Sequence, residues 1–342
     1  MPPSDVTPEP SFDHLLRMSD ARGTFEHALF DQPRREHGYC TDDIARVLVV
    51  AARERDPLPA VGTLTELSLR FLTDALVTDG QCHNRMNLWG RWEDEAGVED
   101  CWGRTIWGLG TAIARSDHGG IRQWATVQFD RACRQRSPWP RAMAFAALGT
   151  ANVLAVRPGH AAARALLNDA ADAICGLDGG PGWLWPEKRL SYANAVVPEA
   201  MIAAGAVLER PDLLQAGLEL LEWLLERETD DGHLSVTPAG GAGPDDVGPA
   251  FDQQPIEVAA MADACARAAG VDGHQRWPHG VSMAARWFLG DNDSGTIMWD
   301  PVTKGGFDGL ERCGANANEG TESTLAMLST FQLARSFVAV PQ

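Results

Sequence analysis

The sequence predicts an all-α protein whose helices close into an (α/α)6 toroid, a ring of six inner and six outer helices. Six segments are apolar on almost every side, which is typical of helices buried at the centre of a protein. An amphipathic segment, typical of an outer helix, follows each of the first five. One short segment near the N-terminus is left over and supplies the sixth outer helix. An open α-solenoid is the alternative arrangement.

The first inner helix is predicted over 41–54. Thr41 is a natural N-cap, and Asp42 and Asp43 follow in the first turn, where the helix dipole favours negative charge. The residues from there to Ala52 are almost all apolar, so the helix is expected to be buried. The same pattern predicts the other inner helices over 100–115, 139–155, 193–208, 252–269 and 319–336.

The outer helices alternate with the inner ones. Over 62–77, Leu64, Leu67 and Phe71 fall on one stripe, which predicts a half-exposed helix. Further outer helices are predicted over 120–135, 161–176, 211–227 and 273–289. The short N-terminal helix, over 12–18, is expected to pack against the last inner helix. We therefore expect one toroid domain over 1–342, with 1–10 flexible.

Four long connections lead from an outer helix to the next inner one, over 78–99, 177–192, 228–251 and 290–318. They are rich in Gly, Pro, Asp and Trp, and some of them are expected to form β-hairpins. In a ring they lie on the face where the inner helices begin. Long loops on a rigid scaffold are common places for functional sites.

Charge and composition exclude several kinds of partner. The net charge of −18 argues against nucleic acids and anionic membranes, which require a basic face, but suits a small neutral or cationic substrate. No secretory signal and no apolar run long enough to cross a membrane is visible. The seven cysteines are scattered singly, which indicates reduced thiols and a cytoplasmic location. The oligomeric state stays open.

Polar and aromatic residues gather at the predicted starts of the inner helices. Six converging N-termini would bring them into one funnel, where carboxylates and amides bind hydroxyl groups and aromatic planes stack on sugar rings. Three of the tryptophans are expected to stack on a ligand. The candidate substrate-binding residues are Tyr39, Trp102, Arg104, Trp139, Trp185, Tyr192, Asn194, Gln253, Gln254, Asn318 and Glu319, and the stacking tryptophans are Trp102, Trp139 and Trp185.

Five carboxylates are candidates for catalysis. A glycosidic bond is cleaved by one carboxyl group that donates a proton and a second that attacks or activates water. Because a helix N-terminus lowers the pKa of a carboxylate, Asp43, with Asp42, is expected to be the nucleophile or base. Glu322, Glu257 and Asp100 are the candidates for the acid, with Glu322 and Glu257 preferred. Helix capping alone is the alternative explanation for each acid, and the stereochemical outcome stays open.

Motifs for other chemistry are missing. The sequence has no dinucleotide loop, no P-loop and no nucleophile elbow, and its histidines and cysteines lack zinc-ligand spacing. We therefore expect neither a cofactor nor a metal ion.

Several motifs resemble those of one known family. They are GYCTDD at 38–43, Glu-Asp with Gly-Arg within 99–104, FDQQPIE at 251–257 and NEGTEST at 318–324. They are similar to a bacterial (α/α)6-toroid family that occurs alone or fused to two-domain glycosyltransferases. The resemblance, which runs from about 11 to 336, implies the toroid, glycoside-hydrolase-like work on carbohydrate, and a glycosyltransferase as a possible partner.

The chain departs from this family at three places. It reads Tyr-Ala-Asn-Ala-Val at 192–196 where the family is expected to read Tyr-Asp-Asn-Ala-Arg. Ile44 replaces a usual Asn, and Cys101 and Trp102 replace a usual Ser-His pair. The resemblance then implies an altered substrate specificity.

These observations favour a glycoside hydrolase acting on a short oligosaccharide or glycoside. A sugar 2-epimerase or isomerase on the same scaffold is the alternative enzyme, but it needs a proton-abstracting base, commonly His, and no inner helix opens with His. A non-catalytic carbohydrate-binding partner of a glycosyltransferase is the third hypothesis. It would keep the tryptophans but would not require the acids.

Overall fold

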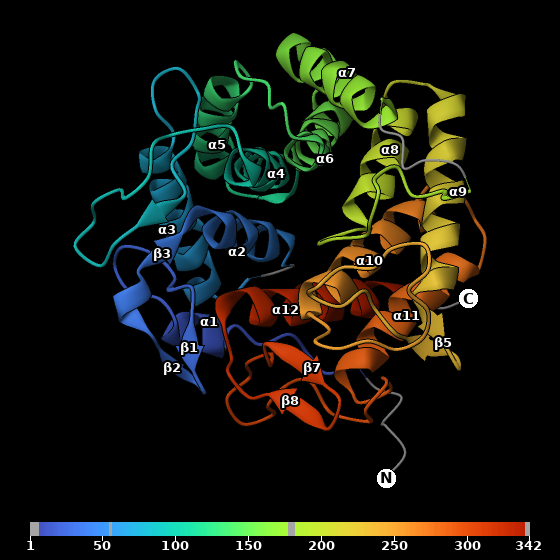
Figure 1. The fold of residues 1–342 in the computed structure, drawn as a ribbon. Helices are drawn as coiled ribbons and strands as arrows, with labels where there is room; N and C mark the ends of the chain where they lie inside the picture. The colour runs from blue at the N-terminus through green and yellow to red at the C-terminus, as the bar shows by residue number, and fades with distance from the viewer. Residues whose placement is uncertain (1–6, 55–56, 177–181, 339–342) are drawn as a thin grey trace.

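The computed structural model describes residues 7–54, 57–176 and 182–338. Six helices surround a central axis within this part of the chain (Figure 1). They are α2 (Thr41–Arg53), α4 (Asp100–Arg115), α6 (Pro140–Val156), α8 (Val196–Val207), α10 (Pro255–Ala269) and α12 (Thr321–Val338). Each packs against the next in chain order, and α12 packs against α2, so the inner helices close a ring.

The outer helices lie outside this ring, each against the inner helix that precedes it. They are α3 (Pro59–Ala75), α5 (Gly119–Ala132), α7 (Ala161–Cys175), α9 (Pro211–Arg227) and α11 (Arg276–Phe288). The short helix α1 (Asp13–Arg17) packs against α12 and completes the outer set. The predicted (α/α)6 toroid is therefore confirmed, and the open solenoid is not formed.

Burial explains why the inner segments are apolar on all sides. In α2, every residue except Asp42 and Arg53 is buried, because α3, α4 and α12 cover it. Four inner helices begin later than predicted, at Pro140, Val196, Pro255 and Thr321. Two of these starts place a proline in the first helical turn, where its missing N–H costs nothing and its fixed φ suits the helix.

Helices α4 and α6 approach so closely that glycine is required between them. A Cβ atom on Gly110 would overlap the carbonyl oxygen of Gly149, and one on Gly149 would overlap the carbonyl oxygen of Ile106. The backbones of α4 and α6 thus touch at this crossing.

Among the described residues, short antiparallel strands lie in three of the four long connections, where two of them form the expected hairpins, and in the segment before α2. They are β1 (Ala28–Leu29), β2 (Gln32–Pro33), β3 (Tyr39–Cys40), β4 (Arg85–Met86), β5 (Thr229–Asp230), β6 (His233–Leu234), β7 (Gly309–Glu311) and β8 (Gly314–Asn316), with a 3-10 turn at Arg35–His37. Strands β1–β2, β5–β6 and β7–β8 are hairpins, whereas β3 pairs with the distant β4. In the described ranges, no helix has both the length and the apolar character needed to cross a membrane.

Candidate active site

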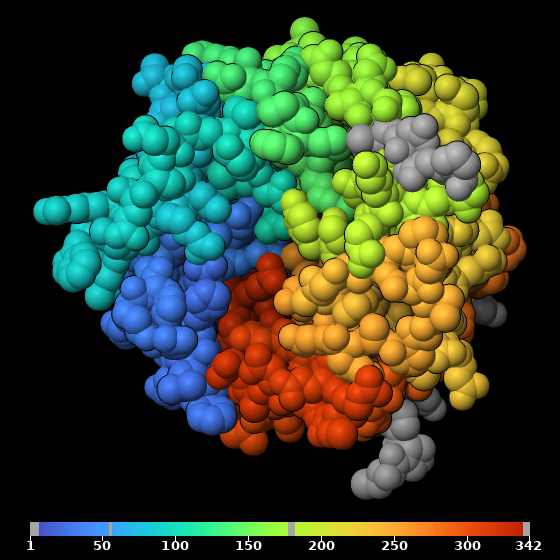
Figure 2. Space-filling view, viewed as in Figure 1, coloured from blue at the N-terminus to red at the C-terminus, as the bar shows by residue number. Residues whose placement is uncertain are grey.

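A pocket follows the axis of the ring, and all six inner helices contribute to its wall. The empty space between its atoms, with the open solvent at its mouth included, is about 550 Å³. Each helix supplies a lining residue: Arg46, Arg104, Phe145, Val196, Ile256 and Glu322. Figure 2 shows a hollow at the centre of the ring, where the first, last and middle segments of the chain meet. This axial cavity is the feature of the structure that corresponds to the funnel expected at the N-termini of the inner helices.

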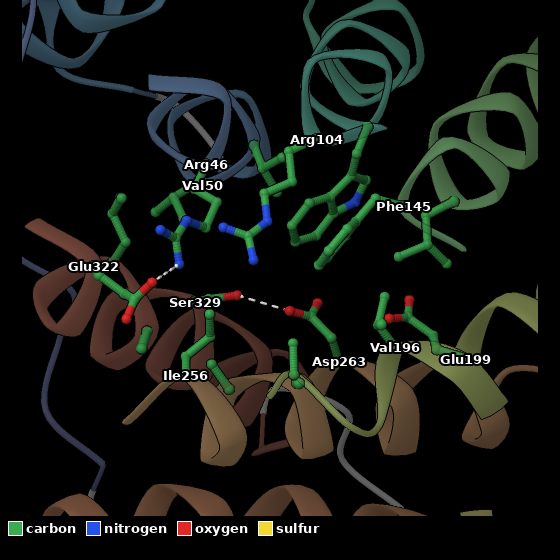
Figure 3. A pocket seen from close by; sticks show the side chains of 18 residues that line it. Arg46, Val50, Arg104, Phe145, Val196, Glu199, Ile256, Asp263, Glu322 and Ser329 are labelled. Carbon is green, nitrogen blue, oxygen red and sulfur yellow. Dashed lines mark hydrogen bonds and ion pairs between the residues drawn. The ribbon is translucent and has the colours of Figure 1, made fainter. Parts of the chain in front are cut away.

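Arg46 joins the first inner helix to the last at the mouth of the cavity (Figure 3). One of its amino groups lies 2.7 Å from Glu322 Oε2, and the other lies 2.5 Å from Asp43 Oδ1. Asp43 is only 2% exposed. It therefore orients Arg46 from behind, while the half-exposed Glu322 side chain lines the cavity.

Arg104 stands beside Arg46 in the mouth and lies between two further acids. Its guanidinium nitrogens are 3.5 Å from Asp42 Oδ1 and 3.7 Å from Asp100 Oδ2, and the group lies 4.6 Å from the ring centroid of Phe145. Tyr192 donates a 2.9 Å hydrogen bond to Asp100. Acids and arginines thus alternate around the mouth.

Two buried polar atoms at this mouth have no hydrogen-bond partner among the described residues: Arg104 Nε and Asp42 Oδ1. Buried polar groups in proteins are nearly always satisfied by protein, water or ligand. One is a donor and the other an acceptor, and both belong to side chains at the mouth. Asp42 Oδ1 nevertheless lies 3.5 Å from a guanidinium nitrogen of Arg104, so it has an ion-pair partner but no hydrogen bond.

Glu322 and Asp100 have opposite pKa shifts although the positive charge of Arg104 lowers the pKa of both. Partial desolvation raises the pKa of Glu322, but Arg46 and then Arg104 outweigh it and hold this pKa below the ordinary value. Burial raises the pKa of Asp100, and Arg104 and the Tyr192 hydroxyl only partly counteract it. At one pH, Glu322 therefore favours the ionised form more than Asp100 does.

The side chains of Asp42 and Asp43 point in different directions, as those of adjacent helical residues must. Their placements are the reverse of those expected, since Asp43 was predicted to be the leading catalytic residue. Asp42 reaches the mouth beside Arg104, whereas Asp43 points into the protein. Burial raises the pKa of Asp43 to about 7 despite the attraction of Arg46. This placement corrects the prediction that Asp43 leads the chemistry.

Glu257 is also placed behind the cavity wall and not in it. It is 4% exposed and accepts hydrogen bonds from the backbone of Ala193 at 2.5 Å and from the backbone and side chain of Asn194 at 3.0 Å. Burial raises its pKa to about 7, partly offset by these bonds. The predicted catalytic Glu257 and substrate-binding Asn194 instead hold the loop that carries Tyr192.

Three aromatic candidates are core residues, which corrects their predicted roles. Trp102 and Trp185 are fully buried, and their indole nitrogens donate to the Ala132 carbonyl at 3.1 Å and to Glu187 at 3.3 Å. Tyr39 is 1% exposed and donates to Asp20 at 2.8 Å. None of them can stack on a ligand without unfolding its surroundings.

The last group of candidates fixes loops around the mouth. Gln253 is fully buried and donates to the Ala250 carbonyl at 3.1 Å, Glu319 lies 3.3 Å from buried His14, and Asn318 accepts from the backbone of Phe30 at 3.0 Å. Gln254 is partly buried at the N-cap of α10, where its backbone carbonyl accepts from Glu257. None of the four lines the axial cavity.

Trp139 and Tyr192 remain the accessible aromatic candidates. Trp139 is the 56% exposed N-cap residue of α6, and Tyr192 is 41% exposed and lies under the Arg141 guanidinium at 4.8 Å. Tyr192 touches the acid network directly. Trp139 does not line the axial cavity.

The interpretation from sequence missed Arg46 and the aromatic wall of the cavity. Arg46 lies three residues after Asp43, the spacing that places two side chains on one helix face, and this spacing was the available signal. Trp107 and Phe145 stack with ring centroids 5.8 Å apart in the wall, but an apolar residue in a buried helix gives no sign of facing a cavity.

One cluster near the site has ligand atoms close enough to hold a metal ion. Those of Glu26, Cys40 and Asp43 lie within 4.8 Å of one another. Glu26 is already paired with Arg85 and Asp43 with Arg46. Burial raises the pKa of the Cys40 thiol well above its usual range, which disfavours the thiolate that metals bind. We assign no metal to it.

No protein-family model and no curated protein matches this sequence. Solved structures do match its fold. A sugar epimerase from a ruminal bacterium superposes with a TM-score of 0.71 at 10% identity, covering 97% of this chain and 96% of that one. A cellobiose 2-epimerase from Spirochaeta thermophila gives 0.68 at 12% identity over 96% and 94%. A family 76 α-mannanase from Bacteroides thetaiotaomicron gives 0.65 at 11% identity over 96% and 93%.

Proposed function

We propose that the protein is a glycoside hydrolase in which Glu322 is the base or nucleophile and Asp100 is the general acid. The observation that carries the proposal is the opposite shift of the two pKa values in neighbouring ion pairs, Glu322 with Arg46 and Asp100 with Arg104. Glycosidases need one carboxylate that stays ionised and one carboxyl group that keeps its proton. The proposal changes the role of Glu322, which was preferred as the acid from sequence, and keeps Asp100 as the acid that the sequence offered as a further candidate.

The neighbouring groups fit this division of roles. Arg46 stabilises the negative charge on Glu322. The Tyr192 hydroxyl positions Asp100, and Asp42 with Arg104 offers the acceptor and donor that a sugar hydroxyl needs, neither of which has a hydrogen bond among the described residues. The excess of acids over arginines at the mouth supports a neutral sugar.

A sugar epimerase or isomerase is the competing proposal, favoured by the names of several structures with this fold. Such an enzyme moves a proton at carbon next to a carbonyl group and needs a base near pH 7. No histidine is among the residues that line the described cavity, which supports the hydrolase. A non-catalytic protein that binds carbohydrate as the partner of a glycosyltransferase is the third possibility.

The test is a panel of oligosaccharides and aryl glycosides incubated with the protein, with reducing sugar and epimer formation followed separately. Glu322→Gln should abolish hydrolysis of every substrate, and Asp100→Asn should abolish hydrolysis of those whose leaving group must be protonated. Glu66→Gln, a matched change on the exposed face of α3, should leave it unchanged. Epimer formation without hydrolysis would replace the proposal by the epimerase. Binding without turnover in all four proteins would favour the non-catalytic partner.

A further inference from the structure

The axial cavity changes character with depth. Its mouth carries Arg46, Arg104 and Glu322, and its floor carries Glu199, Asp263 and Ser329. The wall between mouth and floor is apolar, with Val50, Phe145, Leu148, Val196, Ile256 and Leu325 among its residues. Figure 3 shows Arg46 and Glu322 at one side of the pocket and Glu199 at the other, with Asp263 and Ser329 between them.

The floor needs no ligand, because its polar groups satisfy one another. Asp263 lies 2.7 Å from Arg53 and accepts a 3.2 Å hydrogen bond from Ser329. Glu199 is paired with Arg267 at 2.8 Å. No floor residue has an unpartnered buried side-chain atom in the described part of the chain. The floor therefore closes the cavity and does not recognise a substrate.

The mouth and the wall of the cavity, in contrast, have polar atoms without hydrogen-bond partners among the described residues. Besides Arg104 Nε and Asp42 Oδ1 at the mouth, the indole nitrogen of Trp107 in the wall is buried and has no acceptor. Trp107 is 8% exposed and lines the cavity with Phe145 stacked against it. A buried N–H without a partner costs free energy, and a bound acceptor would recover it.

We infer that this cavity receives an apolar aglycone, while the sugar of the same substrate lies at the mouth. The inference rests on the proposed function and names its substrate class: a glycoside with an alkyl or aryl aglycone that bears one hydrogen-bond acceptor. The acceptor meets the Trp107 indole N–H. Apolar cavities of this kind stay dry and bind apolar groups, because the transfer removes apolar surface from water. A purely sugar chain would leave hydroxyl groups unpaired against the apolar wall.

The test measures binding of n-alkyl 1-thioglucosides and 1-thiomannosides from methyl to hexyl, by titration calorimetry. Their sulfur linkage resists hydrolysis, so binding is measured whether or not the protein is a hydrolase. One of the two sugar series should tighten by about fourfold for each added methylene until the cavity is full. The heat capacity of binding should become more negative along that series.

Two matched variants of α10 locate the alkyl chain. Ala260 lines the cavity and is partly exposed. The larger side chain in Ala260→Leu should therefore fill part of the cavity and reduce the gain in affinity for each added methylene. Ala266 lies on the same helix away from the cavity, so Ala266→Leu should keep the wild-type slope. Trp107→Phe should keep the wild-type gain in affinity for each added methylene. It should lose the preference for an aglycone that carries a hydrogen-bond acceptor.

Equal affinity for methyl and hexyl thioglycosides in the wild-type protein, or no binding of either series, would overturn the inference. An unchanged slope in a folded Ala260→Leu variant would overturn it as well. If that variant fails to fold, the wild-type slope and heat capacity decide alone. Hydrolysis of unsubstituted oligosaccharides together with a flat series would leave the proposed function standing and remove only the aglycone site.

Discussion

Carboxyl groups in this protein differ in role because their surroundings differ. Glu322 pairs with Arg46 and Asp100 with Arg104 beside the mouth, whereas Asp43, Glu257 and Glu228 are buried and hold other groups in place. Their positions at helix starts could be predicted from sequence. Their side-chain directions could not, because a change of one residue along a helix rotates the side chain by about 100°.

The pH dependence of hydrolysis should follow the two mouth carboxyl groups. Activity is expected to fall as the pH falls through the pKa of Glu322, which lies below its ordinary value, because the base is then protonated. It should also fall as the pH rises through the raised pKa of Asp100, because the acid is then ionised. The measurement is kcat/KM against pH, which reports the free enzyme. An Arg104→Met variant should move the low-pH limb upward, and a profile that rises continuously with pH would contradict the assignment.

Glu228 should make the protein less stable as the pH rises. It is buried and accepts hydrogen bonds from the Thr237 backbone at 3.1 Å and hydroxyl at 2.5 Å, and burial raises its pKa to about 8. The folded state therefore binds a proton that the unfolded state loses above about pH 4.5, so this contribution to stability falls between pH 4.5 and 8.

The Glu228→Gln variant keeps an acceptor for Thr237 without the ionisation. Its free energy of unfolding in urea, relative to the wild-type protein, should increase from pH 5 to pH 9 by on the order of 1–4 kcal/mol. The exposed Glu66→Gln variant is the control and should show no such trend. A constant difference across this pH range would show that Glu228 is ionised in the folded protein throughout.

At the scale of elements, the alternation of apolar and amphipathic segments was enough to predict every helix of the ring. The pattern reports burial, and burial on all sides identifies an inner helix. It could not report that α8 begins only at Val196, because the residues before it are also apolar. At this point the backbone N–H of Asn194 donates a hydrogen bond to Glu257, which lies 63 positions further along the chain.

The close crossing of α4 and α6 should depend on glycine. Gly149→Ala is expected to lower the free energy of unfolding by about 1–3 kcal/mol, because the new Cβ would overlap the Ile106 carbonyl. Gly62→Ala in α3, where the Cβ would meet nothing within 4 Å, should instead stabilise the protein by about 0.5–1 kcal/mol. Urea unfolding of both variants checks the pair. Equal changes in the free energy of unfolding in the two variants would contradict this prediction, because they would mean that α4 and α6 can move apart without loss of stability.

At the scale of the whole molecule, closing the ring also builds the site. The ion pair between Arg46 and Glu322 connects positions 276 apart and joins α2 to α12 at the mouth. Sequence reasoning could predict that distant helix starts converge, since six helix pairs imply a ring. It could not predict that Trp102 and Trp185 would be buried in the core, because indoles serve both purposes equally well.

The central claim is that the ring brings an ionised Glu322 and a protonated Asp100 to one glycosidic bond. The most direct measurement compares alkyl glycosides with dinitrophenyl glycosides of the same sugar. The dinitrophenyl leaving group departs without being protonated, whereas the alkyl leaving group must be protonated. Asp100→Asn should lose about 10²–10⁴-fold in kcat/KM on the alkyl glycoside and little on the dinitrophenyl glycoside, while Glu322→Gln should lose activity on both. Equal losses of Asp100→Asn on the two substrates, or full activity in Glu322→Gln, would contradict the claim.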